Sequence, residues 1–285
     1  MDVIHANWAI CGVVAGLAGK ALGISVVTTL RGEDMTRAAC KLLDKLLLKL
    51  CICLSDGMVG VSQTIVDFLR QRTVPGKTHV CLIENGVDDA LLSIQREYND
   101  IKILRLITIG SLIPRKGMDV ILKALNAYTG QIPLTLTIVG EGVEEIALRR
   151  LAQENDLAER VHFIGAVKPD HIPRLLQQHD VLILASYSEG RPNVILEAMA
   201  AEMPVIGSDI PGVDELVRDG ETGFLFKAGD TSELAASIDS LLQTQASLRR
   251  MGRNARQDIL QRGLVWQTTA DKYSTLYRTV MRANR

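Results

Sequence analysis

The chain has 285 residues, of which 47% are hydrophobic and 23% charged, and its 32 basic residues balance 33 acidic ones. A formal net charge of −1 gives no overall attraction to nucleic acid or to anionic lipid, and the composition excludes a largely disordered chain. The length suits one large domain or two ordinary domains, whose apolar cores need no disulfide or metal.

Cysteine usage indicates a reducing compartment. All five cysteines lie in the first 81 residues, at Cys11, Cys40, Cys51, Cys53 and Cys81. Their number is odd, and the chain has no Cys-x-x-Cys pair among them and no histidine cluster near 51–53. Buried free thiols are therefore favoured over a zinc site. We expect a cytoplasmic protein.

Short apolar runs alternate with helical patterns in the first 90 residues. The uncharged stretch 3–19 lacks the basic residues that open a signal peptide, so we interpret it as a buried strand that runs into a helix of small residues. Strands are expected at 3–5, 25–30, 57–61 and 79–83, and helices at 36–54 and 63–71. The helix 36–54 has an apolar face, typical of a helix that covers a core. That face consists of Leu42, Leu43, Leu46, Leu47 and Leu50, with Lys41, Asp44, Lys45 and Lys49 off it.

A polar stretch at 87–102 predicts a linker, after which the alternation restarts. Six strands are expected, at 103–109, 134–139, 161–164, 181–184, 204–207 and 223–226. Helices are expected at 117–128, 144–155, 172–178, 192–201 and 232–242. This order predicts an α/β fold with a doubly wound parallel sheet of the Rossmann type, preceded by part of a similar domain.

A last helix at 266–281 carries an apolar stripe that needs a surface to cover. The stripe consists of Trp266, Tyr273, Leu276, Tyr277 and Val280. The predicted domains are therefore 1–92, 93–262 and a C-terminal helix at 263–285.

Ligands of open parallel sheets bind outside the carboxyl ends of the strands, and two loops there carry weak signals. The loop after 103–109 places Arg115 and Lys116 at a helix start, which suits a pyrophosphate, although taken alone the pair is more typical of a solvated basic loop. The loop after 134–139 pairs Gly140 with Gly142, and these glycines permit close backbone approach to a ligand. An ordinary strand-to-helix turn explains them as well.

The loop after the strand expected at 181–184 carries the strongest signal. Gly190 permits a tight turn, and a proline then opens a helix whose first N–H groups, on Asn193 and Val194, point toward an anion such as a diphosphate. Glu189 precedes that helix, and Glu197 lies about 7 Å along it. One carboxylate on each side of a phosphate-binding helix end suits a nucleotide diphosphate sugar. A capping Glu and a surface Glu are the alternative.

Together these loops resemble the retaining family-4 glycosyltransferases, which have two Rossmann-like domains that face a cleft (the GT-B fold). The segment from Glu189 to Glu197 matches the E-x7-E pattern of that family, and the likeness covers essentially all 285 residues. The other matching runs are Glu-Asn-Gly-Val-Asp at 84–88, Ile-Val-Gly-Glu-Gly at 138–142, Val-His-Phe-Ile-Gly at 161–165, Asp-Ile-Pro-Gly-Val-Asp-Glu-Leu-Val at 209–217 and Gly-Glu-Thr-Gly-Phe-Leu at 220–225.

The resemblance implies a role for each matching residue. Lys116 and Glu189 are implied as the catalytic pair, Lys116 on the donor diphosphate and Glu189 on hydroxyls of the transferred sugar. Glu197 would bind the ribose of a nucleotide such as UDP or GDP, and Val167 would lie by the base. The remaining donor-binding candidates are Ser111, Arg115, Gly140, Gly190, Asn193 and Val194. No metal or other cofactor is expected, and the last helix would cross back onto the first domain.

The chain departs from the family pattern on both the donor side and the acceptor side. Family members usually have an arginine where this chain has Ser111, and many have a histidine where it has Arg31. A second histidine often follows His5 where Asn7 stands here. His5 and Arg31 are the acceptor-side candidates, and a strand-end packing role is the alternative for His5. Family members also normally begin with a glycine-rich turn and further βα units, so we expect a fragment, a start assigned too late, or a missing piece on a separate chain.

We therefore expect a retaining hexosyltransferase that uses a nucleotide diphosphate sugar and a glycan or glycolipid acceptor, as in polysaccharide or lipopolysaccharide biosynthesis. The alternative is a truncated or partner-dependent nucleotide-sugar-binding protein without transfer activity of its own. A nucleotide-sugar epimerase on the same fold lacks specific support. Peripheral contact with the inner face of a membrane is indicated only by Lys41, Lys45 and Lys49 on one helix, and a solvated helix face explains these lysines better.

Overall fold

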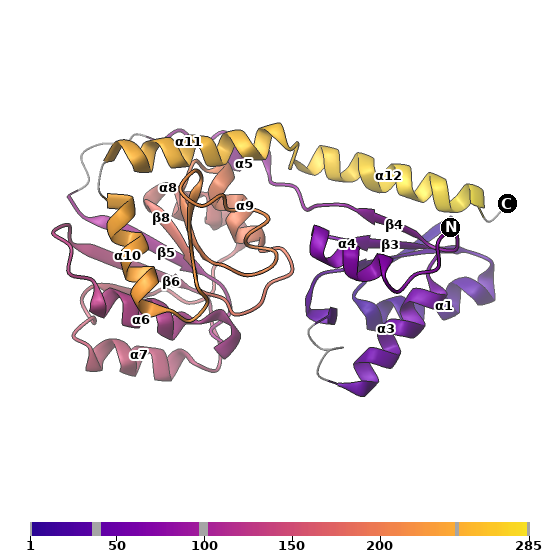
Figure 1. The fold of residues 1–285 in the computed structure, drawn as a ribbon, viewed down its shortest axis with the longest axis horizontal. Helices are drawn as coiled ribbons and strands as arrows, with labels where there is room; N and C mark the ends of the chain where they lie inside the picture. Colours follow the sequence, from indigo (N-terminus) through magenta and orange to yellow (C-terminus); the bar gives the residue numbers. More distant parts are fainter. Residues whose placement is uncertain (1, 36–40, 97–101, 243–244, 284–285) are drawn as a thin grey trace. The chain divides into compact units, whose positions relative to one another are not determined.

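The computed structural model describes residues 2–35, 41–96, 102–242 and 245–283, and the chain forms two compact units (Figure 1). Unit 1 comprises Met1–Gly86, Glu189–Arg191 and Leu264–Arg285, and unit 2 comprises Val87–Ser188 and Pro192–Gly263. Apart from the short segment Glu189–Arg191, the chain changes unit after Gly86 and again after Gly263, whereas the sequence places domain boundaries after residues 92 and 262. Among the described residues, no helix combines the length and the apolar character that crossing a membrane would need.

Unit 1 is built on a four-stranded sheet of order β1-β2-β3-β4 in which all pairs are parallel. Its elements are β1 (Val3–Asn7), α1 (Ala9–Leu22), β2 (Ser25–Leu30), α3 (Leu42–Leu54), β3 (Gly57–Gly60), α4 (Gln63–Arg70), β4 (His79–Leu82) and α12 (Trp266–Ala283). The strands carry apolar side chains on both faces because helices cover both faces of a buried parallel sheet. Leu30 and Met58 pack with α1, α3 and α4, while Val27 and Val59 pack with Leu276 and Val280 of α12.

The leucine face predicted for α3 as its core-facing side is wrong for four of its five leucines, and only Leu47 packs against the core of unit 1. Leu42, Leu43, Leu46 and Leu50 are between 44% and 74% exposed. The helix instead buries its opposite side, formed by Leu48, Cys51, Ile52 and Leu54. The described helix also begins at Leu42, and the predicted residues 36–40 lie outside the described part.

Glycines of α1 explain which side of α3 is buried. A Cβ atom on Gly12 would lie 2.5 Å from Cys51 Sγ, and one on Gly16 would lie 2.4 Å from Leu54 Cβ. The two helices therefore approach each other more closely than larger side chains would allow, and this contact selects the Cys51 side of α3 for burial.

The expectation of buried thiols holds for Cys51 alone among the described cysteines. Desolvation raises its pKa to about 11. Cys81 is half-buried, whereas Cys11 and Cys53 are exposed, because they lie on the outward sides of α1 and α3. Cys40 lies outside the described residues.

Unit 2 contains a parallel six-stranded sheet of order β10-β9-β8-β5-β6-β7. Its elements are α5 (Asp89–Leu92), β5 (Leu104–Ile109), η1 (Pro114–Lys116), α6 (Met118–Ala127), β6 (Leu134–Val139), α7 (Glu145–Glu154), β7 (Val161–Phe163), η2 (Pro169–His171), α8 (Ile172–Gln178), β8 (Val181–Leu184), α9 (Asn193–Ala200), β9 (Val205–Ser208), β10 (Gly223–Phe226), α10 (Thr231–Leu242) and α11 (Gln245–Gln261). The doubly wound Rossmann-like sheet predicted from the sequence is confirmed.

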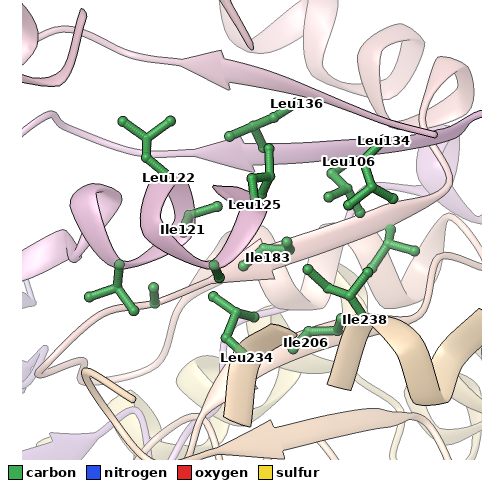
Figure 2. Packing of buried hydrophobic residues seen from close by; sticks show 14 of the residues in the cluster. Leu106, Ile121, Leu122, Leu125, Leu134, Leu136, Ile183, Ile206, Leu234 and Ile238 are labelled. Carbon is green, nitrogen blue, oxygen red and sulfur yellow. The ribbon is translucent and has the colours of Figure 1, made fainter. Parts of the chain in front are cut away.

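The core of unit 2 lies between this sheet and helices α6 and α10. Figure 2 shows strand side chains such as Leu136 and Ile183 gathered with Ile121 and Leu125 of α6 and Ile238 of α10. All five side chains are at most 1% exposed, so the strands that end at the candidate site are held in a close-packed interior.

Two segments of unit 2 differ from the sequence prediction. The predicted linker 87–102 contains the short helix α5, and Arg96 attaches this segment to unit 2 by donating hydrogen bonds to the carbonyl oxygens of Ala201 (2.7 Å) and His179 (2.5 Å). Helix α11 was not predicted, because its many polar residues obscure the few that it buries, among them Met251 and Ile259.

Candidate active site

The two loops with the strongest chemical signals flank one point of the unit 2 sheet. Strand β5 lies between β6 and β8, so the direction in which the sheet grows reverses beside it. Open α/β sheets bind ligands outside the carboxyl ends of the strands at such a point. The loop 110–117 follows β5 and the loop 185–192 follows β8, so the fold places both loops at the expected binding position.

Backbone contacts hold these two loops together. Tyr187 N donates a hydrogen bond to Arg115 O at 2.8 Å, and Arg115 Nη1 donates one to Ser188 O at 2.8 Å. A Cβ atom on Gly117 would lie 2.2 Å from Ala185 O, so only glycine permits this approach. Part of the hydrogen-bonding capacity of Arg115, a predicted donor-binding residue, is therefore used to fix the loop after β8.

Lys116 lies at the end of η1, directly before α6. The side chain is half-buried and extends toward the end of β5. Its Cε lies 3.7 Å from the position that a Cβ atom on Gly110 would occupy. Ser111, the neighbour of Gly110, is exposed. The structure thus brings one cation and one hydroxyl to the carboxyl end of the central strand.

Glycines shape the neighbouring loop after β6. Gly140 has φ +137°, and a Cβ atom on it would lie 2.0 Å from Gly110 O. A Cβ atom on Gly142 would lie 2.3 Å from Leu112 O. The backbone of this loop is therefore pressed against the loop after β5, which explains the pair of glycines without reference to a ligand.

Substitution of Gly140 by alanine is expected to lower the free energy of unfolding of unit 2 by about 2–4 kcal/mol, since the new methyl group meets backbone rather than a movable side chain. Gly165→Ala is the matched control: its φ is +72°, but its nearest neighbour is Glu141 Oε1 at 3.5 Å, so only about 1 kcal/mol of backbone strain is expected. Chemical denaturation measures both values, and equal losses would contradict the proposed clash.

Helix α9 begins at Asn193 after Pro192, whose side chain cannot cap the first turn. The N–H groups of Asn193 and Val194 come before that of Ile195, which donates a hydrogen bond to Pro192 O at 3.1 Å. The helix start therefore directs backbone N–H groups toward the carboxyl edge of the sheet, where they favour an anion.

Glu197 lies one turn into α9 and is half-buried. Desolvation raises the pKa of its carboxyl group above the ordinary value of 4.5. A carboxylate that is partly withdrawn from water gains from a hydroxyl donor, such as a diol, that restores its lost hydrogen bonds.

The predicted site residues are divided between the two units. Unit 2 holds Ser111, Arg115, Lys116, Gly140, Val167, Asn193, Val194 and Glu197. Val167 is half-buried in the segment that follows β7. Unit 1 holds Glu189 and Gly190 together with the acceptor-side candidates His5 and Arg31.

His5 lies on β1 within a network of hydroxyl groups. Its Nε2 lies 2.8 Å from Thr29 Oγ1 and its Nδ1 lies 2.8 Å from the Tyr277 hydroxyl. Thr29 Oγ1 is 3.0 Å from the Tyr273 hydroxyl. Desolvation, and then the nearby Arg31 cation, lower the pKa of His5 from its ordinary value of 6.5. Both ring nitrogens thus contact side chains that join β1 and β2 to α12.

The three residues that form this network with His5, namely Thr29, Tyr273 and Tyr277, were not among the predicted site residues. The only signal for Tyr273 and Tyr277 is their spacing of four residues on the last helix, which was interpreted as part of an apolar stripe. Both tyrosines do pack on the sheet of unit 1, but their hydroxyl groups also bond within the polar network. Trp266, predicted for the same stripe, is 52% exposed.

The fold and the site together define a two-domain α/β protein of the nucleotide-binding type, with a cation, a helix start and a carboxylate at the switch point of its larger sheet. The family model described as glycosyl transferases group 1 matches residues 95–258, and that of glycosyltransferase family 4 matches residues 1–91. The chain belongs to the glycosyl transferases group 1 family and has the GT-B fold. It is thus a glycosyltransferase.

Two relatives match all or most of the chain. It is 28% identical to the N-acetyl-alpha-D-glucosaminyl L-malate synthase of Bacillus anthracis, over all of this chain and 76% of that protein. It is 30% identical to a glycogen synthase of Mycobacterium tuberculosis, over 81% of this chain and 56% of that protein. The chain thus spans about three quarters of the first relative and little more than half of the second.

Solved structures share the fold. The sucrose-phosphate synthase of Thermosynechococcus elongatus superposes with a TM-score of 0.82 at 24% identity, over 99% of this chain and 74% of that one. The Anabaena protein Alr3699/HepE, in complex with UDP and glucose, superposes with a TM-score of 0.85 at 23% identity, over 98% of this chain and 78% of that one.

Proposed function

We propose that this chain transfers a hexose from a nucleotide diphosphate sugar to a hydroxyl group of a glycan or glycolipid acceptor, with retention of the anomeric configuration. The observation that carries the proposal is the placement of Lys116 and the start of α9, with Glu197 one turn inside that helix, at the switch point of the unit 2 sheet. A diphosphate fits the cation and the N–H groups, and a ribose diol fits the carboxylate.

Each proposed contact uses a group that the site supplies. Lys116 and the N–H groups of Asn193 and Val194 bind the diphosphate, and Glu197 accepts hydrogen bonds from the ribose. Val167 lies against the base, and Glu189 accepts hydrogen bonds from hydroxyls of the transferred sugar. Ser111, Arg115, Gly140 and Gly190 complete the proposed donor site. His5 and Arg31 remain the proposed acceptor-side residues, although both nitrogens of His5 already contact hydroxyl groups.

The proposed reaction replaces one bond at the anomeric carbon on a single face of the sugar. The bond from that carbon to the diphosphate oxygen breaks, and the acceptor oxygen forms its bond from the same side. The acceptor proton passes to the departing diphosphate, so no protein nucleophile is required. Lys116 and the α9 start stabilise the charge that develops on the leaving group. Transfer without a metal ion is part of the proposal, and activity should therefore survive EDTA.

Similar proteins support the choice of donor. HepE has been solved with UDP-glucose, and the pneumococcal O-GlcNAc transferase GtfA with UDP and GlcNAc. We propose UDP or GDP as the nucleotide, a cytoplasmic location, and peripheral contact with the membrane where the acceptor is lipid-linked.

Isothermal titration with UDP, GDP and ADP tests the proposal. One nucleotide is expected to bind, and Glu197→Ala should weaken it at least about tenfold because the ribose loses a charged hydrogen-bond acceptor. Because burial raises the pKa of Glu197, affinity should also begin to fall at a pH above 4.5 as the solution is acidified. The control Glu159→Ala removes an exposed carboxylate of unit 2 and should leave affinity unchanged.

Two outcomes would contradict the proposal, one of this titration and one of an activity assay with the sugar donors. If the folded chain binds none of the three nucleotides, the proposed donor site is wrong. If it binds one nucleotide but neither transfers nor hydrolyses the corresponding sugar donors, the chain is a nucleotide-sugar-binding protein without transfer activity of its own.

A further inference from the structure

Three consecutive residues of the loop after β8 belong to unit 1 rather than to unit 2. The segment Glu189–Arg191 belongs with Met1–Gly86 and Leu264–Arg285, whereas β8 before it and α9 after it are parts of unit 2. Glu189, the proposed ligand of the transferred sugar, is the first residue of this segment. The contacts that hold the segment in unit 1 therefore determine where that carboxylate lies.

The middle residue of the segment packs directly on the loop that follows β2. A Cβ atom on Gly190 would overlap Arg31 O, and a Cβ atom on Gly32 would overlap Gly190 Cα. Gly32 has φ +99°, a conformation in which a larger residue would be strained. The two glycines thus let the two backbones meet with no side chain between them. This contact also places Glu189 next to the loop that carries Arg31, an acceptor-side candidate.

The last residue of the segment is fixed by a buried ion pair. Arg191 Nη2 lies 2.8 Å from Glu84 Oε1, and the arginine side chain is 0% exposed. Arg191 is the only buried arginine or lysine in the part of the chain that the structure describes. A guanidinium group withdrawn from water is strongly disfavoured unless a negative charge compensates it. Glu84 supplies that charge, so it helps to hold Arg191 in this position.

Glu84 is in turn held by helix α12. Thr269 Oγ1 donates a hydrogen bond to Glu84 O at 2.9 Å, and Lys272 Nζ lies 3.7 Å from Glu84 Oε2. Glu84 follows β4 and Arg31 follows β2, so both anchors of the segment come from the carboxyl edge of the same parallel sheet. The segment is therefore fixed by strands and a helix of unit 1.

We propose that Arg191 and Glu84 are positioning residues for transfer: their ion pair fixes Glu189 where its carboxylate accepts hydrogen bonds from hydroxyls of the transferred sugar. Neither Arg191 nor Glu84 touches the substrate. The inference rests on the proposed function, because it uses the role given there to Glu189. A buried ion pair suits such a task, since its geometry is specific while its net contribution to stability is often small.

A variant that removes both charges separates positioning from folding. Glu84→Gln/Arg191→Met leaves no unpaired charge in the interior, and uncharged replacements of a buried ion pair are often neutral for stability. We expect a thermal midpoint and an affinity for the nucleoside diphosphate close to those of the wild type. The kcat should fall about thirtyfold, because a small displacement of Glu189 is enough to slow bond exchange. Hydrogen exchange in a peptide that contains 187–191, measured by mass spectrometry, should become about tenfold faster as the segment opens locally.

The matched control is a second ion pair that lies away from the site. Arg105 Nη2 lies 2.8 Å from Asp180 Oδ1 at the amino ends of β5 and β8, the same strands that carry the candidate site at their carboxyl ends. Arg105→Met/Asp180→Asn should leave kcat and the exchange of 187–191 unchanged. Arg191→Lys keeps the charge of Arg191 and should retain more activity than Arg191→Met, although it lacks the planar fork of the guanidinium.

Four results would overturn the inference. A double variant with the kcat of the wild type, or one that does not fold, would show that the ion pair serves folding only. A loss of nucleoside diphosphate affinity would make Arg191 a ligand of the donor. A lower kcat with unchanged exchange of 187–191 would show that Arg191 does not act by fixing the segment. Failure of the proposed function is distinct, because the wild type itself then binds no nucleotide or transfers no sugar. The exchange measurement still tests in that case whether the ion pair fixes the segment.

Discussion

Replacement of Glu189 by alanine is expected to reduce transfer at least about a thousandfold and to leave nucleotide binding unchanged. In the proposed site Glu189 holds hydroxyls of the transferred sugar, so its loss frees the sugar ring to move away from the geometry that bond exchange requires. A misplacement of about 1 Å can cost a hundredfold in rate, and the loss of a charged hydrogen bond in the transition state adds to this. Steady-state kinetics with the donor identified by titration measures the effect.

The nucleotide alone distinguishes this effect from unfolding. Glu189→Ala should bind the free nucleoside diphosphate as tightly as the wild type, because the diphosphate and ribose contacts are assigned to Lys116, Glu197 and the α9 start. Glu189→Gln keeps an oxygen acceptor and should retain more activity than the alanine variant. Near-normal turnover by Glu189→Ala would show that its assigned role is wrong.

Some of the buried strands could be predicted from the sequence to the residue, and the ends of β3, β5 and β9 were missed by one residue. The predicted runs 25–30, 134–139 and 181–184 coincide with β2, β6 and β8. Parallel strands that are covered on both faces carry continuous aliphatic runs, and such runs have clear ends. The order of strands and helices then limits the topology to a doubly wound sheet, because the crossover connection between parallel strands is almost always right-handed.

The orientation of α3 could not be predicted in the same way. Its sequence is apolar on more than one side, so the helical period identifies a helix but does not say which side meets the sheet. Which side of α3 is buried depends on Gly12 and Gly16 of α1. These glycines lie 39 and 38 positions before Cys51 and Leu54, the residues of α3 that they meet. Of the five leucines that the prediction placed on the core-facing side, four are exposed.

The candidate site shows a similar division. Lys116, Asn193 and Glu197 could be found from the sequence because each lies at a fixed offset from a strand end or a helix start. The position of Arg115 against Ser188 O and of Tyr277 against His5 could not, because these contacts join residues 73 and 272 positions apart. Local patterns carry no information about such pairs until the strands are placed beside one another.

Substitution of Lys116 by alanine is expected to lower kcat by about a hundred- to a thousandfold. The ammonium group is assigned to the diphosphate, whose negative charge grows as its bond to the sugar breaks, so the lysine stabilises the transition state more than the bound donor. The half-buried position beside Gly110 strengthens this interaction, since fewer water molecules screen it. Affinity for the free nucleoside diphosphate should also fall, but by less than kcat.

Two further variants separate the charge of Lys116 from its shape. Lys116→Arg keeps the charge and should retain more activity than Lys116→Ala, although a planar guanidinium does not reproduce the position of an ammonium group. Lys168→Ala removes an exposed lysine after β7 and should leave kcat unchanged. If Lys116→Ala raises KM alone and kcat stays at the wild-type value, the lysine binds the donor without stabilising the leaving group. The charge on the departing diphosphate must then be stabilised by the α9 start, and the proposed division of roles at the switch point is wrong.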